Sequence, residues 1–409
     1  MRKIVFLSFV PLFLHAYTLQ ELVELSHNNR LIDSSKHTVE SAQSSYESIK
    51  SSYLPTLDID ASYAHASKES PAVSRDTIRG AASFKYTLYD GGKRGDLYSQ
   101  RALKIDSSKS SLESAKNELS LDITKDYFNY LSLLSDKEAT EAQINQLEAE
   151  LDRLKNFYEV GSATKDELDK IDSRVKNAIL SKHEIELELI KITHSLEYLT
   201  LKNDISIDSG STIKEFSGEV KPRADIVSMK KDVESLMYEA SASKSTNYPT
   251  IFFDDTISKT KYYFNDKSKE SGFLIKNQNI ASLNLSWNIL DFGATTSEYE
   301  SKYSAYLSQK SILEHEEHKA SVDLKLAQES YSIALKKIDA ASATLEASKE
   351  TYELIKVKFE NGAVDNVAYL EALSEVYDAT KAYHRALNDA EIKKAEVIYF
   401  SGKDIKEFL

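Results

Sequence analysis

The stretch Leu88-Tyr89-Asp90-Gly91-Gly92-Lys93 marks an abrupt change in the pattern of the chain. Residues 84–89 alternate between apolar and polar side chains, which predicts a strand with one apolar face. From Lys93 to Val160 there is no proline and only one glycine, which predicts a single very long helix. Asp90 can accept hydrogen bonds from the free N–H groups that open this helix. Because glycine permits the backbone angles of a sharp turn, we expect a strand-to-helix turn at Asp90, Gly91 and Gly92.

A second junction of the same kind follows later in the chain. Residues 284–290 alternate, Asp291-Phe292-Gly293 interrupts the alternation, and another proline-free run extends from Ala294 to Phe359. We therefore expect Asp291 and Gly293 to form a second strand-to-helix turn.

The spacing of these landmarks indicates a tandem duplication. Asp90 and Asp291 are 201 residues apart, and so are Gly161 and Gly362, which follow the two long runs. The segments before the first strand of each unit also match, with Tyr53-Leu54-Pro55-Thr56 against Asn247-Tyr248-Pro249-Thr250. One glycine turn would be a weak signal, but three landmarks in the same order are strong evidence for a repeat.

These residues resemble the TolC-like outer-membrane efflux protein family. The resemblance rests on the two turns, on the Leu-Pro-Thr segment, and on two helix-end motifs, Tyr158-Glu159-Val160-Gly161 and Phe359-Glu360-Asn361-Gly362. It covers essentially the whole chain after the first 16 residues. It implies a trimeric channel-tunnel that extends from the outer membrane of a Gram-negative bacterium into the periplasm.

The first residues have the pattern of a secretory leader. Arg2 and Lys3 precede an apolar core, residues 4–14, and Ala16 suits the position before a cleavage point. This core is shorter than the ~20 residues that a membrane-spanning helix needs. We therefore expect a signal peptide over residues 1–16.

Composition narrows the class of protein further. The chain has 409 residues but only 11 glycines and 5 prolines, which favours long helices over a loop-rich fold. It has no cysteine, so disulfides contribute nothing to its stability. The net charge is −13, which argues against a nucleic-acid partner.

Periodicity divides the chain after the leader into two structural repeats, with an irregular segment between them and a short tail after them. Each repeat is expected to hold a helix, a strand pair and two long helices, and the first helix should run unbroken from Thr18 to Ser52. The expected segments are a first repeat over 17–202 (strands 56–66 and 80–89, long helices 93–160 and 164–200), a linking segment over 203–221, a second repeat over 222–400 (strands 250–260 and 280–290, long helices 294–359 and 365–400) and a tail over 401–409.

Four strands of about ten residues have the length that a membrane β-barrel uses. Because an open sheet in lipid leaves its edge groups unpaired and a closed barrel needs about eight strands, one chain cannot form a barrel alone. Strand counting allows a dimer with eight strands or a trimer with twelve, and the family resemblance selects the trimer. The expected inward faces are polar, which suits a water-filled interior: Asp58, Asp60, Lys85, Ser282 and Asn284.

The expected fold is therefore mainly α with a membrane β-barrel portion. Long antiparallel coiled-coil helices would form an α-barrel tunnel, and four strands from each chain would complete a 12-stranded barrel in a trimer. Large residues recur at sevens in the second long run, at Tyr331, Ile338, Leu345, Tyr352 and Phe359, with mainly small residues between them. This spacing suits close coiled-coil packing.

In the family, acidic residues beyond the helix-ending glycines form a gate where helices draw together. Aligned on Gly362, Glu371 falls on one gate position, and Ala368 falls on the other, where relatives often have aspartate. Three copies of one carboxylate around an axis would attract cations and repel anions. The alternative is that these are ordinary solvated charges of helix faces. The further candidates are Asp365 and, in the first repeat, Asp166, Glu167 and Asp169.

The two helix-end motifs also resemble the segments through which family members contact the hairpin of a periplasmic adaptor. The second motif has Asn361 where the family usually has valine. As glycines that end helices, both Gly161 and Gly362 would be explained without any partner. The adaptor-contact candidates are Tyr158, Val160, Gly161, Phe359 and Gly362.

No pattern indicates an enzyme. His315 and His318 lie three apart and lack the four-residue spacing of the zinc protease motif. Gly91-Gly92-Lys93 lacks the upstream glycine and the following Ser or Thr of a phosphate-binding loop. We expect no cofactor and no metal.

The function that the resemblance implies is a passive exit duct of a tripartite efflux or type I secretion system. Its partners would be two further copies of the chain, outer-membrane lipid, a periplasmic adaptor, and an inner-membrane transporter of the RND or ABC class. Two alternatives remain open at this point: a periplasmic adaptor, which should carry an additional globular β-rich domain, and a structural coiled-coil rod without a pore.

Overall fold

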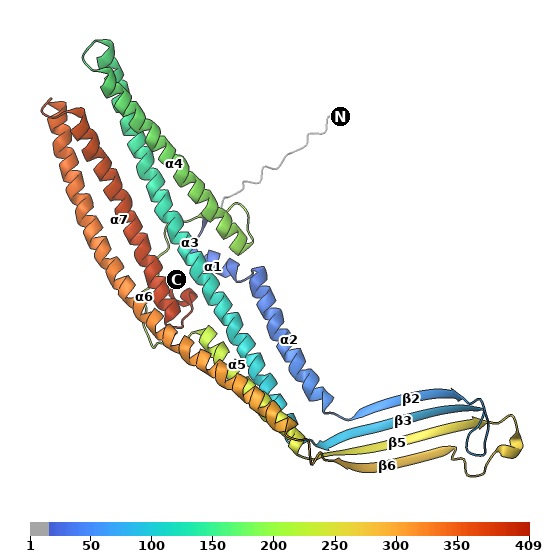
Figure 1. Ribbon diagram of the computed structural model, residues 1–409. Coiled ribbons are helices and arrows are strands. Elements are labelled where there is room, and N and C mark those ends of the chain that lie inside the picture. Colours follow the sequence, from blue (N-terminus) through green and yellow to red (C-terminus); the bar gives the residue numbers. More distant parts are fainter. Residues whose placement is uncertain (1–15) are drawn as a thin grey trace, which may run out of the picture. The chain divides into compact units, whose positions relative to one another are not determined.

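The computed structural model describes residues 16–409, so the expected signal peptide lies outside the described residues except for Ala16. The chain divides into two compact units, each built from segments of both halves of the chain. Within the described residues, the first unit consists of 16–35, 112–224 and 317–409, and the second of 36–111 and 225–316. Helices α3 (Lys93–Glu159) and α6 (Ala294–Glu360) run through segments of both units (Figure 1).

The second unit contains one antiparallel sheet of four strands. The strands are β2 (Thr56–His65), β3 (Asp76–Tyr89), β5 (Thr250–Tyr263) and β6 (Asn277–Ser286), in the spatial order β2-β3-β5-β6. The central pair, β3 with β5, joins the two halves of the sequence. β2 and β6 are the edges of the sheet, and each pairs on one side only among residues 16–409.

The register of the sheet separates apolar from polar side chains. Leu57 lies opposite Phe84, and Phe253 lies opposite both Tyr86 and Leu283, so one face is mainly apolar. The residues expected to face inward all lie on the other face: Asp58, Asp60, Lys85, Ser282 and Asn284. The alternation read from the sequence therefore corresponds to the two faces of one sheet.

Asp255 is the exception on the apolar face. It lies opposite Phe84 on β3 and Ala281 on β6, between Phe253 and Ile257 on its own strand. Its Oδ1 atom is buried and has no hydrogen-bond partner among the residues that the structure describes. A carboxylate with apolar neighbours on every side is energetically unfavourable, so Asp255 weakens this face.

Two strand boundaries differ from those expected. β6 ends at Ser286, four residues before the expected end at 290, and it begins at Asn277 rather than at 280. The last pair joins Ser286 to Thr250, and the residue before Thr250 is Pro249, which has no N–H to continue the ladder. Trp287 instead donates a hydrogen bond from Nε1 to the backbone oxygen of Asn247, at 3.1 Å.

Three further segments also differ. β3 begins at Asp76 instead of 80, and β5 continues to Tyr263 instead of 260, because these ends pair with each other. The expected helix from Thr18 to Ser52 is broken into α1 (Leu19–Ser26) and α2 (Arg30–Ser52). Asn29 causes the break: its Oδ1 accepts from Leu31 N–H at 2.9 Å and its Nδ2 donates to the Leu199 oxygen at 2.8 Å.

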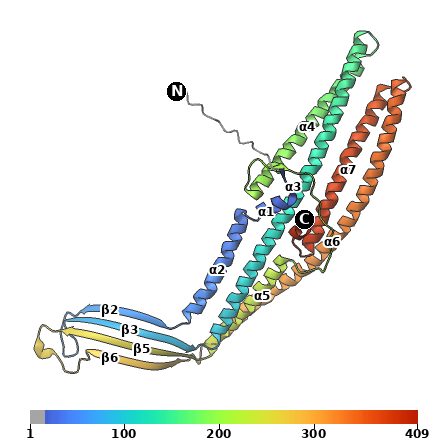
Figure 2. The same ribbon diagram turned by 180° about the vertical axis from the view of Figure 1, so that it is seen from behind.

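In the second unit, α5 (Ala224–Ser243) packs along the first part of α3 (Figure 2). Lys104 of α3 forms an ion pair with Asp232 of α5 at 2.8 Å, and Ser107 and Ser228 are hydrogen-bonded at 3.0 Å. Two short 3-10 helices, Lys244–Asn247 and Lys267–Lys269, lie before β5 and in the loop that follows it.

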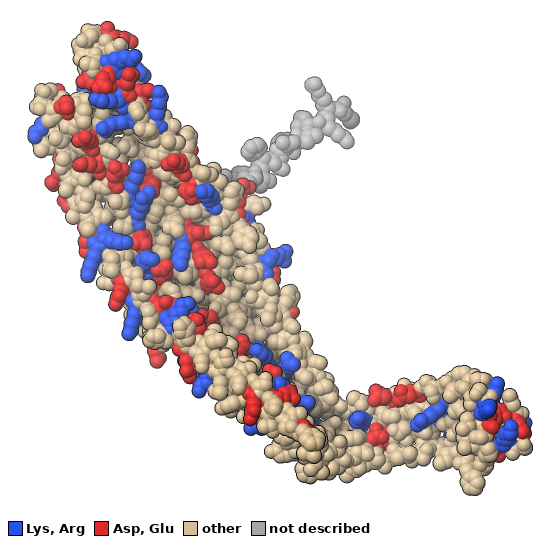
Figure 3. All heavy atoms as spheres, in the orientation of Figure 1, with Lys and Arg blue, Asp and Glu red and all other residues tan. Residues whose placement is uncertain are grey.

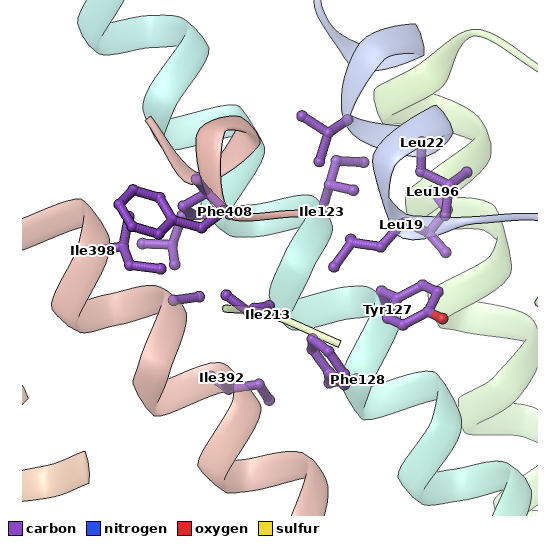
Figure 4. Close-up of a cluster of buried hydrophobic side chains, with 14 of the residues drawn as sticks. Leu19, Leu22, Ile123, Tyr127, Phe128, Leu196, Ile213, Ile392, Ile398 and Phe408 are labelled. Atoms are coloured by element: carbon purple, nitrogen blue, oxygen red, sulfur yellow. The ribbon is translucent and has the colours of Figure 1, made fainter. Parts of the chain in front are cut away.

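The first unit contains α4 (Lys165–Thr200) beside α3 and α7 (Asn366–Phe400) beside α6 (Figure 1). Two short strands, β1 (Ala16–Tyr17) and β4 (Ser206–Ile207), pair in parallel. Figure 4 shows the main buried cluster of this unit, in which Leu19, Tyr127, Phe128 and Ile398 come from α1, α3 and α7. This cluster explains why the first unit is compact, because apolar side chains from distant segments are removed from water together.

The end of the chain is not a simple tail, as had been expected for residues 401–409. It forms a 3-10 helix, Ile405–Phe408, whose Ile405 is fully buried and whose Phe408 is nearly so. Both side chains belong to the buried cluster, and their apolar character explains why the segment folds back onto the protein.

Four long helices and four strands were expected from the sequence, and both sets are confirmed. No helix within residues 16–409 combines the length and the apolar character needed to cross a membrane. Charged side chains of both signs are interspersed along the helices in the view of Figure 3, whereas the strands show few charges between their two ends.

Candidate functional site

The turns at Gly161 and Gly362 end α3 and α6 in the same way. Both glycines have positive φ, 76° and 71°. Gly161 N–H donates to the Tyr158 oxygen at 3.0 Å and Ser162 N–H donates to the Phe157 oxygen at 2.7 Å, and the second turn repeats both bonds. This is the Schellman arrangement, in which a left-handed glycine satisfies the last carbonyls of a helix.

The helix that follows each turn begins with a side-chain cap. Thr164 and Glu167 form a capping box at the start of α4, in which the Glu167 carboxylate accepts from Thr164 N–H at 2.8 Å. This bond and the one from the Thr164 hydroxyl hold the pKa of Glu167 below its usual range. At the start of α7, Asp365 accepts from Ala368 N–H at 3.0 Å. Two gate candidates, Glu167 and Asp365, therefore stabilise helix ends.

The structure brings three of the gate candidates together although they are far apart in the sequence. Asp166, Glu167 and Asp365 line one cavity of about 630 Å³, which Lys170 and Arg174 also line. Asp166 forms an ion pair with Lys170 at 2.6 Å, so its charge is partly compensated. Asp166 and Glu167 of the first repeat therefore share a cavity with Asp365 of the second, whereas Asp169 does not line it.

Glu371 lies on α7, six residues beyond Asp365, and lines a second cavity of about 520 Å³. Its carboxylate is exposed, and within the described part of the chain it has no hydrogen-bond or ion-pair partner. Arg174 and Leu370 line both cavities. Of the five gate candidates, Glu371 and Asp169 are thus the two exposed carboxylates whose charge no neighbour among the described residues and no helix end engages.

An aromatic group next to the turns was not recognised in the sequence as a unit. The ring of Phe359 stacks on that of Tyr369 with centroids 4.7 Å apart, and the Arg153 guanidinium lies over Phe359 at 4.4 Å. Gln146 donates to the Tyr369 hydroxyl at 2.7 Å. Tyr352 completes the group, and burial raises its pKa. Heptad spacing had indicated Tyr352 and Phe359, but nothing in the sequence pairs them with Gln146 and Arg153.

The adaptor-contact candidates occupy different environments. Val160 is 72% exposed, and Tyr158 is also exposed. Phe359 is partly buried by the stacking and cation–π contacts described above. Tyr158 and Val160 are therefore available to another protein, whereas Phe359 already packs within the chain.

The two strand-to-helix turns use their aspartates as helix caps. Asp90 accepts from Arg94 N–H at 2.8 Å, and Asp291 accepts from Thr295 N–H at 2.9 Å and from Gly293 N–H at 3.0 Å. The Thr295 side chain, followed by the backbone N–H groups of Thr295 and Gly293, lowers the pKa of Asp291 through hydrogen bonds to the carboxylate. Gly91, Gly92 and Gly293 all have positive φ. A β-carbon on Gly91 would lie 2.7 Å from the Ser245 backbone oxygen, so close approach adds a second requirement for glycine there.

The described residues contain no group of three His, Cys, Asp or Glu side chains that could hold a metal ion.

Comparison with solved structures shows the same fold in outer-membrane channels. A membrane protein from Pseudomonas aeruginosa superimposes with a TM-score of 0.85 at 16% identity, covering 96% of this chain and 91% of that one. The CmeC outer membrane channel of Campylobacter jejuni gives 0.83 at 17% identity over 95% and 86%. The outer membrane protein VceC of Vibrio cholerae gives 0.84 at 13% identity over 95% and 96%.

Sequence comparison gives the family. No curated protein matches the chain. The family model for outer membrane efflux proteins matches residues 22–198 and 220–402, which together are most of the chain and include both strand pairs and all four long helices. The chain belongs to the outer membrane efflux protein family.

Proposed function

We propose that three copies of this chain form the passive exit duct of a tripartite efflux or type I secretion system. The family makes the chain an outer-membrane efflux protein. We infer in addition that the channel is a trimer, that it works with partner proteins, and that acidic side chains gate it. A periplasmic adaptor and an inner-membrane transporter of the RND or ABC class would supply the energy and select the cargo.

The observation that carries the proposal is the sheet with two unpaired edges. β2 and β6 have ten residues each, and neither has a second neighbouring strand in the part of the chain that the structure describes. Each unpaired backbone group costs several kcal/mol in lipid, so the edges must pair with other copies. Twelve strands leave a lumen, whereas eight would be filled by side chains. The polar face that includes Asp58 and Asp60 suits the water-filled side of such a barrel.

The helices attached to the strands would continue the barrel as a tunnel. α3 and α6 have 67 residues each, which corresponds to about 100 Å at ~1.5 Å per residue. Such helices are long enough to carry a duct through much of a periplasm. The two turns at Gly161 and Gly362 would form its far end.

We further propose that Glu371 is the principal gate residue. Asp166 has Lys170 as an ion-pair partner, while Glu167 and Asp365 cap helices. Glu371 is exposed and has no such engagement within the described residues, so three copies would place uncompensated charge around the axis. Tyr158 and Val160 are the proposed adaptor contacts, because both are exposed beside the Gly161 turn.

Single-channel conductance in planar bilayers tests the duct and the gate together. The wild type is expected to give a small, cation-selective conductance, and Glu371→Gln should lose most of that selectivity. Glu167→Gln is the matched control, because glutamine keeps the capping box while removing one nearby charge.

The possible results separate the two proposals. Selectivity unchanged in Glu371→Gln would leave the duct in place and exclude Glu371 as its gate. An inserted protein that never conducts, in wild type or variant, would contradict the duct itself.

A further inference from the structure

We propose that the apolar face of the sheet ends in a site for an anionic lipid of the outer leaflet. Lys259 and Lys261 of β5 would bind its phosphate groups. Gly80 and Ala61, two neighbouring positions with almost no side chain, form a strip that would bind one of its acyl chains. This inference rests on the proposed function, since it requires the strands to cross the outer membrane.

The first observation is the order of side chains along β5. On the mainly apolar face, Ile251, Phe253 and Ile257 are followed by Lys259 and Lys261, two cations in succession on the same side. Both lysines are exposed. The face therefore changes from apolar to basic between Ile257 and Lys259, which are consecutive residues on the same side of β5.

The position of this change fits the edge of a bilayer. Lys259 is nine residues beyond Thr250, where β5 begins, and nine residues of strand span about 30 Å. At a tilt of about 40° the height is roughly 23 Å, close to the ~25 Å of an apolar barrel band. Lys259 and Lys261 would then lie at the headgroup level on the side away from the helices.

The second observation is that these lysines lack an anion from the protein. Within residues 16–409, neither Lys259 nor Lys261 forms a hydrogen bond or an ion pair. Two carboxylates lie on this face of the strands. Asp76, opposite Tyr263, already accepts from the Tyr63 hydroxyl and pairs with His65, each at 2.7 Å, and Asp255 lies four residues before Lys259 on β5.

Two lysines of the adjoining loop behave differently. Lys276 pairs with Glu270 at 3.1 Å, and Lys269 pairs with Asp266 at 3.7 Å. Lys269 and Lys276 therefore have partners within the chain, whereas the Lys267 side chain of this loop has none among the described residues, like the two strand lysines.

The third observation is the bare strip beside Lys259. Gly80 lies opposite Lys259 on one side and Ala61 on the other, so two neighbouring positions have almost no side chain. A β-carbon on Gly80 would meet no atom within 4 Å, so packing within the chain does not require glycine there. Glycine weakens a strand and often marks the close approach of another molecule. Tyr63 and Ile78, both exposed, border the strip.

Together these features match the shape and charge of one lipid. The basic pair supplies charge for phosphates in the headgroup region, where each lysine near an anionic surface contributes about a fivefold change in affinity. The strip lies beside Lys259 in the register of the sheet and leaves room for an acyl chain. A free phosphate ion would bind the two lysines but would make no contact with the strip.

The test is binding of bis-phosphorylated lipid A to the purified full-length protein, measured by native mass spectrometry across a lipid titration. Lys259→Gln/Lys261→Gln should bind about 30-fold more weakly than wild type, since each lysine contributes about a factor of five. Lys267→Gln/Lys269→Gln removes the same charge from the loop and should change affinity less than threefold.

A second variant separates the lipid site from general stability. Gly80→Val fills the strip with a strong strand former, so the melting temperature in detergent should stay the same or rise. Lipid A binding should nevertheless fall several-fold. Inorganic phosphate at millimolar concentration should not displace the lipid, because it cannot use the strip.

The outcomes are decisive in both directions. Equal lipid A affinity in wild type and in both strand variants would overturn the site. Equal losses in the loop and strand variants would show a nonspecific charge effect and overturn it as well. A wild type that inserts into phosphatidylcholine vesicles but shows no lipid A preference contradicts only this inference. Failure to insert into any vesicle contradicts the proposed function.

Discussion

At the scale of single residues, Gly91 is the position where backbone angle and space coincide. Its φ of 72° is left-handed, and an added β-carbon would lie 2.7 Å from the Ser245 oxygen and 2.9 Å from the Tyr248 β-carbon. Gly92 has a similar φ of 89° but open space around it. A substitution at Gly92 therefore reports the effect of backbone strain alone, whereas one at Gly91 reports strain together with a steric clash.

We predict that Gly91→Ala lowers the free energy of unfolding by about 2–4 kcal/mol, the sum of left-handed strain and overpacking. Gly92→Ala should lower it by about 1 kcal/mol, since strain alone acts there. Thermal unfolding of the purified variants in detergent measures both. Equal losses would mean that the close approach of residues 245–248 contributes nothing.

A buried charge supplies a second test, at the scale of packed elements. Asp136 of α3 is fully buried, and its Oδ2 accepts from Arg385 Nε at 2.8 Å and Nη2 at 2.6 Å. Its Oδ1 has no hydrogen-bond partner among the described residues. The pair ties α3 to α7, and Asp136 depends on it, because an unpaired buried carboxylate is strongly unfavourable.

Arg385→Gln is expected to cost about 3–5 kcal/mol of stability, because it leaves the Asp136 charge buried without a cation. Adding Asp136→Asn should recover part of that loss. Chemical unfolding of the single and double variants measures the recovery. Lys337→Gln is the control: Lys337 lies 3.6 Å from Asp389 in an exposed pair, and its loss should cost less than about 1 kcal/mol. A double variant less stable than Arg385→Gln would exclude this account.

The faces of the sheet give a third prediction. Asp255 lies on the apolar face and Asp254, its neighbour in sequence, lies on the polar face opposite Lys85. If the apolar face meets lipid, Asp255→Ala should stabilise the protein in membranes by about 1–2 kcal/mol, and Asp254→Ala should not. Resistance to thermal dissociation after reconstitution is the readout. Stabilisation by Asp254→Ala instead would mean that the faces are assigned the wrong way round.

For the whole molecule, the open edges of the sheet make assembly testable by cross-linking. The chain has no cysteine, so introduced thiols react without background. We predict that cysteines at Asp60 on β2 and Gln278 on β6, joined by a flexible bis-maleimide, yield covalent species of two and three chains.

Ser83→Cys with Thr256→Cys is the matched control, because these residues face each other on the central strands and their hydroxyls lie 3.1 Å apart. That pair should link only within a chain. Species larger than one chain from the control pair, or none from the edge pair, would contradict assembly through β2 and β6.

The sequence by itself determined the elements that depend on neighbours along the chain. Alternation at period two located the strands, long proline-free runs located the helices, and the interval of 201 residues revealed the repeat. Asp90 and Asp291 were identified as turn residues because a helix start needs an acceptor close in sequence. These signals are local, so no tertiary contact is required to read them.

Only the tertiary structure decided which distant residues meet. Asn29 ends a helix by bonding to Leu199, and Ile405 and Phe408 fold back because a buried cluster accepts them. Asp166 and Glu167 share a cavity with Asp365, and Phe359 is covered by Arg153 and Tyr369. Such partners come from different helices and from residues as far apart in the sequence as Leu19 and Phe408. Pattern along one element specifies which face is apolar, but the contacts that cover that face arise only when the elements pack.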